Sequence, residues 1–323
     1  MVSFRFYVVA TVAWFLALAV GVVVGSALDE AIVTSLRDRV DSVETNLDAK
    51  VAVIDAKDSE IAQLNEAVDG MTPFALDARV DQTSTILVAE SGLDNEAVAQ
   101  LGARLVEGGS AIQGVVWLEE TWSLEDDAVR RAVADAVGTD ATTPSEVRSG
   151  AWAAVLGPLT GDVAQAGSET TSIPTVTPTT SVPPVVGIFS DPTVSALAEL
   201  GVLRLEAFEG PVPDAGRPVV VSLVGPQTAL SGVGAKELVV GALDLSIPVV
   251  VGEVNDGAGP RGVLLTDVMG SNEAGVSGVD NVDQPAGRVS LVLAIAELLD
   301  GGRGRYGVGD GAERAVPEWA GSS

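Results

Sequence analysis

The sequence predicts an α/β protein in three parts: an N-terminal transmembrane helix, a long coiled-coil helix and a mostly parallel-sheet extracytoplasmic domain. Three observations lead to this prediction. An uncharged apolar run covers residues 6–24, apolar residues then recur every seven positions as far as Val68, and short apolar runs alternate with helical patterns from Asp81 onwards. Such alternation is typical of parallel strands that are joined by helices.

Residues 1–28 are predicted to be a signal anchor, because the nineteen residues of the apolar run, at about 1.5 Å each, cross roughly 30 Å of bilayer hydrocarbon. Arg5 precedes the run, so the positive-inside rule leaves the N-terminus in the cytoplasm and the C-terminal domain outside the cell membrane. A cleaved signal peptide is the alternative, since residues 25–27 resemble a cleavage site, although the run exceeds the usual length of about 7–15 residues. Small residues that would let two such helices approach closely recur at Ala13, Ala17, Gly21 and Gly25.

Residues 29–72 are predicted to form a coiled-coil stalk. Two apolar series are offset by three or four positions, as the a and d positions of a heptad repeat are. Mostly β-branched a positions favour a parallel two-stranded form, and Gly70 and Pro73 are expected to end the helix. The a positions are Val33, Val40, Leu47, Ile54, Ile61 and Val68, and the d positions are Leu36, Val43, Lys50, Lys57 and Leu64.

The heptad pattern predicts a partner for residues 32–68, which would be either a second copy in a homodimer or another membrane protein. Lys50 and Lys57 at d positions either weaken the middle of the seam or mark where an acid of the partner lies. A single amphipathic helix that lies on its own domain is the alternative. A helix of roughly 40 residues is about 60 Å long, which would hold the distal domain clear of the membrane.

The α/β domain is predicted to cover residues 81–305. A Ser/Thr/Pro-rich insertion, residues 167–184, is expected to be exposed and partly extended, and residues 306–323 are expected to form a flexible tail. Asp283 is the expected N-cap and Pro285 the first-turn proline of the last helix. Strands are predicted near 85–88, 112–118, 202–206, 218–224 and 247–251, and helices near 94–107, 124–137, 145–165, 191–200, 232–243 and 289–299.

The composition excludes several classes of function. The chain carries 18 basic and 45 acidic residues, a formal charge of −27, so nucleic acid would repel it. It has no Cys and no His, which rules out disulfides, a Ser-His-Asp triad, a Cys nucleophile and a His- or Cys-ligated zinc site. Its lysines, at 50, 57 and 236, do not form a P-loop. We expect no cofactor, no metal site and no catalysis.

The motif-like patterns have structural interpretations. Residues 302–307 match G-x-G-x-x-G but follow a helix rather than a strand, so helix termination explains them. Residues 119–120 and 125–127 are acidic, without the alternate spacing of a calcium loop, and the second group favours a helix N-terminus. Asp280 and Asp283 suit capping, with a partner- or cation-binding edge as the alternative. Two acids about 5–9 Å apart could also hydrolyse an envelope glycan.

Both ends of the chain carry a family resemblance. The opening MVSFRFYVVATVAWFLALAVGVVVGSAL and the closing VDNVDQPAGRVSLVLAIAELLDGGRGRYG resemble the actinobacterial copper transporter MctB family, and the order of anchor, coiled coil and α/β domain is the same. The resemblance implies a single-pass cell-envelope protein with a role in copper homeostasis or transport. It also implies an alternative, a division-linked scaffold that binds a neighbouring membrane protein and regulates cell separation.

Direct copper binding by this chain is not expected from its composition. Copper sites use Cys, Met or His side chains, and the chain offers only three methionines, at positions 1, 71 and 269. A transmembrane barrel needs many alternating strands of about ten residues, whereas the apolar runs here are short and separated by helices. We therefore expect association rather than conduction by this chain alone.

Overall fold

The computed structural model describes residues 4–160, 188–208, 216–255, 260–269, 275–309 and 311–318, and excludes the side chains of residues 4–6 and 25–33. The predicted insertion at 167–184 lies outside the described residues. The chain divides into two compact units, residues 1–64 and residues 65–323.

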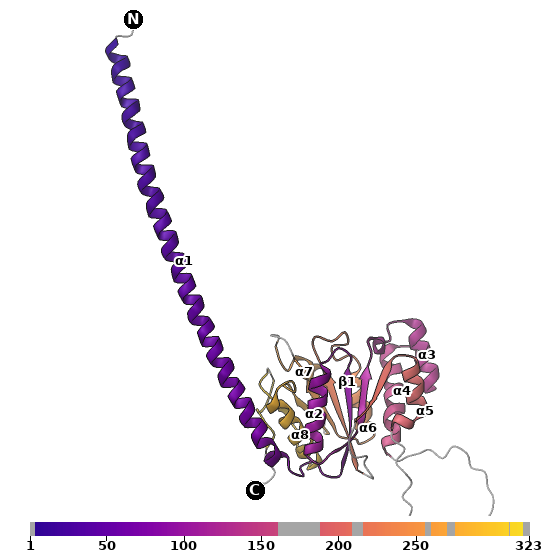
Figure 1. Cartoon of the computed structure of the whole chain (residues 1–323). Helices are drawn as coiled ribbons and strands as arrows, with labels where there is room; N and C mark the ends of the chain where they lie inside the picture. The colour runs from indigo at the N-terminus through magenta and orange to yellow at the C-terminus, as the bar shows by residue number, and fades with distance from the viewer. Residues whose placement is uncertain are drawn as a thin grey trace, which may run out of the picture. The chain divides into compact units, whose positions relative to one another are not determined.

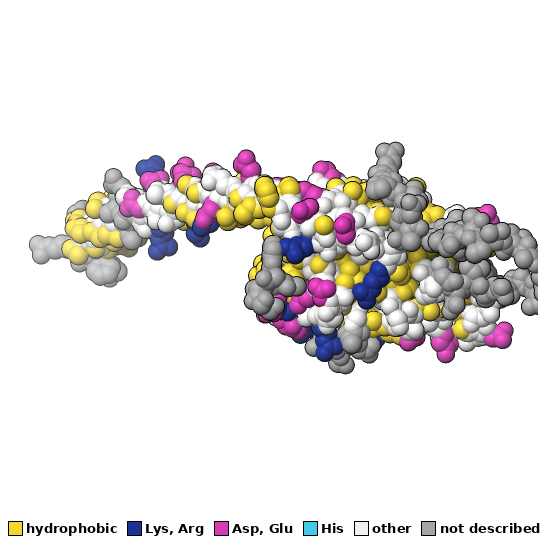
Figure 2. Space-filling model, turned by 90° about the horizontal axis from the view of Figure 1, so that it is seen from below, with side chains coloured by type: hydrophobic (Ala, Val, Ile, Leu, Met, Phe, Trp, Pro, Cys, Tyr) yellow, Lys and Arg dark blue, Asp and Glu magenta, His cyan; other side chains and the backbone are white. Residues whose placement is uncertain are grey.

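Helix α1, Phe4–Leu76, is the first element (Figure 1). Its segment Tyr7–Val24 is the one described helix stretch that is long and apolar enough to cross a membrane. Figure 2 shows hydrophobic side chains gathered at the N-terminal end of this helix, with acidic and basic side chains along its later part. This confirms one N-terminal apolar helix.

The expected end of this helix at Gly70 and Pro73 is wrong, because α1 continues to Leu76. Proline lacks the amide that would bond one carbonyl of the preceding turn. Packing within the second unit outweighs that loss: the buried Thr72 donates its hydroxyl proton to the Val68 carbonyl at 2.8 Å, and the Leu76 side chain is fully buried.

Seven described strands form one sheet in the order β3-β2-β1-β4-β5-β6-β7. All neighbouring pairs are parallel except β2 and β3, which pair antiparallel at one edge. A mostly parallel sheet is thereby confirmed. The strands are β1 Thr83–Glu90, β2 Ala111–Leu118, β3 Leu203–Ala207, β4 Arg217–Val224, β5 Val249–Glu253, β6 Val276–Val279 and β7 Arg305–Tyr306.

Helices cover both faces of the sheet, as parallel strands require (Figure 1). The helices are α2 Asn95–Glu107, α3 Asp127–Val137, α4 Pro144–Leu156, α5 Pro192–Glu199, α6 Ala235–Asp244, α7 Val263–Met269 and α8 Pro285–Leu299. Helices α2 and α8 pack on one face, and the other five pack on the opposite face.

The core lies in two layers because side chains alternate along each strand. In β1, Ile86 and Val88 enter the layer beneath α3–α7, whereas Leu87 and Ala89 enter the layer beneath α2 and α8. Every residue of β1 is buried. Within this strand, residues 86–89 form a continuous apolar run, as is usual for strands covered on both faces.

The C-terminal third differs from the sequence prediction in three elements. Helix α7 and strands β6 and β7 were not predicted, because they are short and β6 lies in a Gly-rich stretch. Helix α8 begins at Pro285, four positions before the predicted residue 289. Tyr306 is fully buried, and Gly307 donates its amide to the Arg314 carbonyl at 3.0 Å, so packed chain continues beyond residue 305.

Asp283 is not the N-cap of α8, contrary to the sequence prediction. Gln284 occupies that position without a side-chain cap bond, and Pro285 is at the first turn as predicted. The Asp283 carboxylate bonds to Arg261 instead. The Asp283 carboxylate therefore forms an ion pair with the loop between β5 and α7 instead of capping α8.

Leu101→Ala is expected to lower the free energy of unfolding by about 2–5 kcal/mol, because it leaves a cavity beneath α2 where Leu101 is fully buried. Val240→Ala on α6, where Val240 is 47% exposed, should change it by less than about 0.5 kcal/mol. Urea unfolding of the full chain in detergent, followed by tryptophan fluorescence, measures both values. Equal losses would contradict the assignment of Leu101 to the core.

Candidate functional site

The carboxyl ends of the parallel strands form the first candidate site. In open α/β sheets, ligands bind outside these ends, where the strand order reverses. Here the reversal lies between β1 and β4, because the chain moves from β1 to β2 on one side and later returns to β4 on the other. Buried carboxylates occupy this edge at the ends of β1, β5 and β6.

Glu90 ends β1 beside the reversal point and is 1% exposed. Its Oε2 atom accepts hydrogen bonds from the Thr228 hydroxyl at 2.5 Å and the Gly225 amide at 3.1 Å, and its Oε1 atom accepts one from the Gly232 amide at 2.6 Å. Burial raises the pKa of Glu90 above its usual value of 4.5, and these hydrogen bonds offset part of the shift. One carboxylate therefore fastens the loop that follows β4.

Glu253 and Asp280 repeat this arrangement at β5 and β6. Glu253 is fully buried and accepts from the amides of Gly262 at 2.9 Å and Leu264 at 3.1 Å. Burial raises the pKa of Glu253, and the charge of Asp280 raises it further. Asp280 accepts from the amides of Val308 at 2.9 Å and Gly309 at 2.6 Å. Each strand-end acid holds the backbone of a loop.

Asp283 and Arg261 form a bidentate ion pair at the same edge. The Arg261 Nη1 and Nη2 atoms lie 2.6 Å and 2.9 Å from the two carboxylate oxygens of Asp283. Burial works to raise the pKa of Asp283, but hydrogen bonds from Arg261 and Gln284 outweigh it and the pKa is lowered. The same pair raises the pKa of Arg261.

The turn between β6 and α8 holds its shape through Gly287 and Arg288. A Cβ atom at Gly287 would overlap the carbonyl oxygen of Asn281, so the helix start packs directly on the turn. Arg288 is 7% exposed and donates from Nη1 to the carbonyl oxygens of Asp283 at 2.8 Å and Val282 at 3.4 Å. Residues 279–288, with the sequence VDNVDQPAGR, thus form one tightly packed turn and helix start.

This geometry stabilises loops and presents little that could act on a substrate. A glycosidase acid must reach the glycosidic oxygen, whereas Glu90, Glu253 and Asp280 are at most 1% exposed and face backbone amides. A cavity of about 310 Å³ is lined by the paired Arg261 and Asp283 and also by Asp94, Glu96 and Arg288. Within the described ranges, no three or more carboxylates gather as a metal site.

The stalk is the second candidate site, and the residues predicted to form its seam all belong to helix α1. The Val33 side chain and Gly25 lie outside the described side chains, and Val68 is partly exposed. Lys57 bonds Glu60 of the same helix at 2.7 Å. The exposed seam residues are Leu36, Val40, Val43, Leu47, Lys50, Ile54, Lys57, Ile61 and Leu64, and the exposed small residues of the membrane segment are Ala13, Ala17 and Gly21.

Sequence reasoning singled out Asp280 and Asp283 but missed Glu90, Glu253 and Arg261. The two glutamates end the apolar runs TILVAE and VVVGE, and an acid at the end of a fully buried strand is a signal that could have found them. No comparable signal marks Arg261, because its partner lies 22 positions later.

Comparison with known proteins places this chain in a family. The family model described as "Copper transport outer membrane protein, MctB" matches residues 1–317. The chain is 24% identical to "Copper transporter MctB" of Mycobacterium tuberculosis (strain ATCC 25618 / H37Rv) over 319 residues, 97% of this chain and 98% of the relative. It is also 24% identical to the protein of that name from Mycobacterium leprae (strain TN) over 326 residues, with the same coverage.

Glu90→Gln is expected to change the pH dependence of stability. A raised pKa means that the folded chain holds this proton more tightly than the unfolded chain does. The resulting stabilisation is present below pH 4.5 and is lost as the pH rises through the raised pKa. Glutamine does not titrate, so the free energy of unfolding of the unsubstituted chain minus that of the variant should fall as pH rises through this window.

Asp283→Asn is the matched variant with the opposite sign. Because the pKa of Asp283 is lowered, its stabilisation is present above pH 3.8 and is lost as the pH falls through the lowered pKa. Urea unfolding at a series of pH values measures both differences. Slopes of the same sign for the two variants would contradict the assigned environments.

Proposed function

Because the chain belongs to the MctB family, we propose that it is a single-pass cell-envelope protein that serves copper homeostasis through association of its stalk, rather than through catalysis. The family match over residues 1–317 supports the copper role. The observation that carries the association is the stripe of exposed apolar side chains at heptad spacing along α1. We further propose that copper is cargo or signal of an assembly to which this chain contributes the scaffold.

Exposure of this apolar stripe to water is unfavourable in free energy. Val40, Leu47 and Ile54 are 57%, 59% and 56% exposed, and fully burying one such side chain contributes about 1.5–3 kcal/mol. A single helix has no second surface on which to bury them. Pairing with another helix through knobs-into-holes packing removes the whole stripe from water.

A second copy of this chain is the partner we propose. Two chains anchored in one bilayer by Tyr7–Val24 leave it in the same direction, so their stalks meet in parallel. β-branched a positions suit that two-stranded form. Lys57 already has a partner in Glu60, and both side chains are mostly exposed, so the pair can turn towards solvent at small cost.

The orientation we propose places the N-terminus in the cytoplasm and the α/β domain outside the cell membrane. Arg5 precedes the apolar segment, and the acidic residues Asp29 and Glu30 follow it. Basic residues beside a span favour its cytoplasmic side.

Replacing Val40, Leu47 and Ile54 together by Asp is expected to abolish self-association, because each change places an unpaired charge in the seam at a cost of several kcal/mol. The matched control replaces Ser42, Ala49 and Ala56 by Asp, which adds the same charge at c positions facing away from the seam. Light scattering of the full chain in detergent should give a dimer for the unsubstituted chain and the control. The seam variant should be a monomer with an unchanged near-UV circular dichroism spectrum.

A cellular readout tests the copper role separately. In cells that lack the gene, the control variant should restore the cell-associated copper of unmodified cells, and the seam variant should not. Normal association by the seam variant would remove the stalk as the interaction surface. Normal copper content with the seam variant would separate association from copper homeostasis.

Introduced cysteines test the orientation, and the background is clean because the chain has no Cys. Ser149→Cys, on the exposed surface of α4, should react in intact cells with a maleimide that does not cross membranes. Ser3→Cys, before the membrane segment, should react only after the membrane is opened. Labelling of Ser3→Cys in intact cells would reverse the proposed orientation.

A further inference from the structure

Helix α1 continues into the second compact unit, and its last turns there expose an aromatic side chain. Thr72 and Leu76 are 1% and 0% exposed, so one face of the helix packs on the α/β domain. Asp69 forms an ion pair with Arg104 of α2 at 2.7 Å, which also holds the helix end on the domain. Phe74, between the two buried residues, is 81% exposed, the largest exposed fraction among the large apolar side chains that the structure describes.

Met71 adds a second exposed apolar side chain to this segment. It is 60% exposed and lies seven positions after Leu64, the last predicted d position of the stalk seam. The heptad register therefore continues beyond Val68, the last predicted seam residue. In this register Met71 occupies the next d position, and Phe74 occupies the g position that lies beside the seam.

The two residues expected to end the helix do not interrupt this register. Gly70 occupies a c position and Pro73 an f position, and both positions lie on the side of the helix away from the a and d seam. The helix continues through them to Leu76. Met71 and Phe74 are thus held on a formed helix before a partner binds, which lowers the entropy cost of association.

Charges beside the stalk seam indicate how two copies align. In a parallel pair in register, each g residue lies opposite the e residue of the partner's next heptad. Arg39 is at a g position and Glu44 at the following e position, so opposite charges meet on both sides of the seam. Both side chains are exposed, and across residues 32–72 no such pair of g and e positions brings like charges together. This alignment places Met71 opposite the partner's Met71.

A second copy in this register also provides a contact for Phe74. In knobs-into-holes packing, a g residue helps to line the hole that receives the partner's next a residue, which here is Ala75. The small side chain of Ala75 leaves room for the ring. An aromatic side chain buries about 150–250 Å², and buried aromatic side chains are common anchors of protein interfaces.

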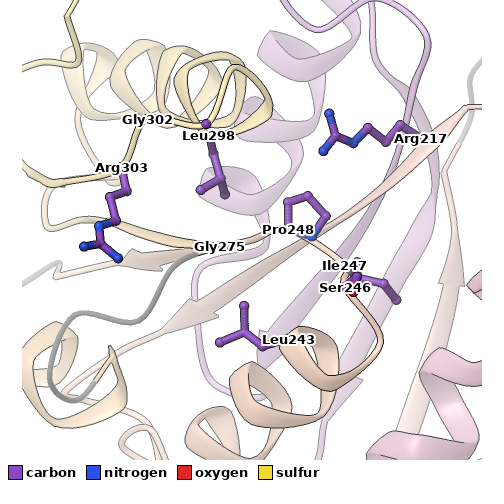
Figure 3. Close-up of a pocket in the computed structure, with 10 residues that line it drawn as sticks. Arg217, Leu243, Ser246, Ile247, Pro248, Gly275, Leu298, Gly302 and Arg303 are labelled. Atoms are coloured by element: carbon purple, nitrogen blue, oxygen red, sulfur yellow. The ribbon is translucent and has the colours of Figure 1, made fainter.

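The cavity at the start of the parallel strands is lined by side chains that other parts of the chain already engage. Figure 3 shows Arg217 and Leu298 among the residues around this cavity of about 640 Å³. Arg217 donates from Nη1 to the carbonyl oxygen of Leu299 at 3.2 Å, and Ile247 and Leu298 are 1% and 6% exposed. The exposed end of α1 is therefore the better candidate for an interaction surface.

We propose that the homodimer interface continues from the stalk onto the end of α1 that packs on the α/β domain. There Met71 meets the partner's Met71 at a d position, and Phe74 packs against the partner's Ala75. The inference rests on the stalk dimer proposed above and extends it by one heptad. Dimerisation then also fixes the two α/β domains next to each other, because each is attached to its own α1 through buried Thr72 and Leu76.

Single introduced cysteines test this interface, because the chain has no Cys of its own. Met71→Cys should give a disulfide-linked dimer when native membranes that carry the full chain are treated with the oxidant diamide. Leu64→Cys, at the preceding d position, should give the same product and reports the stalk alone. Glu66→Cys, at an exposed f position, is the matched control and should give at least tenfold less. Coexpressed chains with tags of two sizes identify the product as two copies, through a band of intermediate mass.

The two seam cysteines separate this inference from the function on which it rests. Linkage through both supports the extended interface. Linkage through Leu64→Cys, with Met71→Cys no higher than the control, would overturn the extension and leave the stalk dimer in place. Absence of linkage through either cysteine would contradict the stalk dimer and, with it, the extension.

Phe74→Glu should raise the dissociation constant of the dimer at least tenfold, because it places an unpaired charge beside the seam in both copies. Val240→Glu adds the same charge at a side chain that is 47% exposed, on α6 at the opposite face of the sheet from α2 and α8, and should leave the constant within twofold. Sedimentation equilibrium of the full chain in detergent measures both constants. Equal constants for the two variants would overturn the role assigned to Phe74.

Discussion

Loops at the carboxyl edge of the sheet are held by carboxylates that the strands themselves deliver. A parallel sheet covered on both faces sends its connections to its edges, where backbone amides need acceptors. Glu90, Glu253 and Asp280 each accept at least two loop amides while nearly buried. For Glu90 and Glu253 this burial raises the pKa. The chain that follows β4, β5 and β7 is therefore held by groups whose charge is costly to bury.

The burial of these acids also distinguishes a structural carboxylate from a catalytic one. An acid that catalyses must meet its substrate, and its pKa shift then serves a reaction. At this edge the perturbed acids face inward and their oxygen atoms are already engaged by the chain. In the bidentate Arg261–Asp283 pair, each side chain likewise neutralises the charge of the other. A perturbed pKa here reports burial, which is why the proposed copper role is better sought in assembly than in an acid pair.

Local signals made parts of the fold predictable from sequence. Helix α2 lies between Asp94, whose side chain caps it, and Gly108, and both signals are adjacent to it in the chain. Asp283 misled, because a local cap and a distant ion pair use the same carboxylate and only the fold brings Arg261 to it. The role of Glu90 was equally hidden, since its partner Gly232 lies 142 positions away. The fold topology determines which distant residues these side chains contact.

Contacts within the chain hold both edges of the sheet. At the carboxyl edge, opposite charges and amides satisfy one another, so little of the field extends outward. At the amino edge, Arg217 donates to the carbonyl oxygen of Leu299 and so joins the start of β4 to the end of α8. A net charge of −27 repels anions from the chain as a whole. Any anionic partner must therefore gain enough from local contacts to overcome that repulsion.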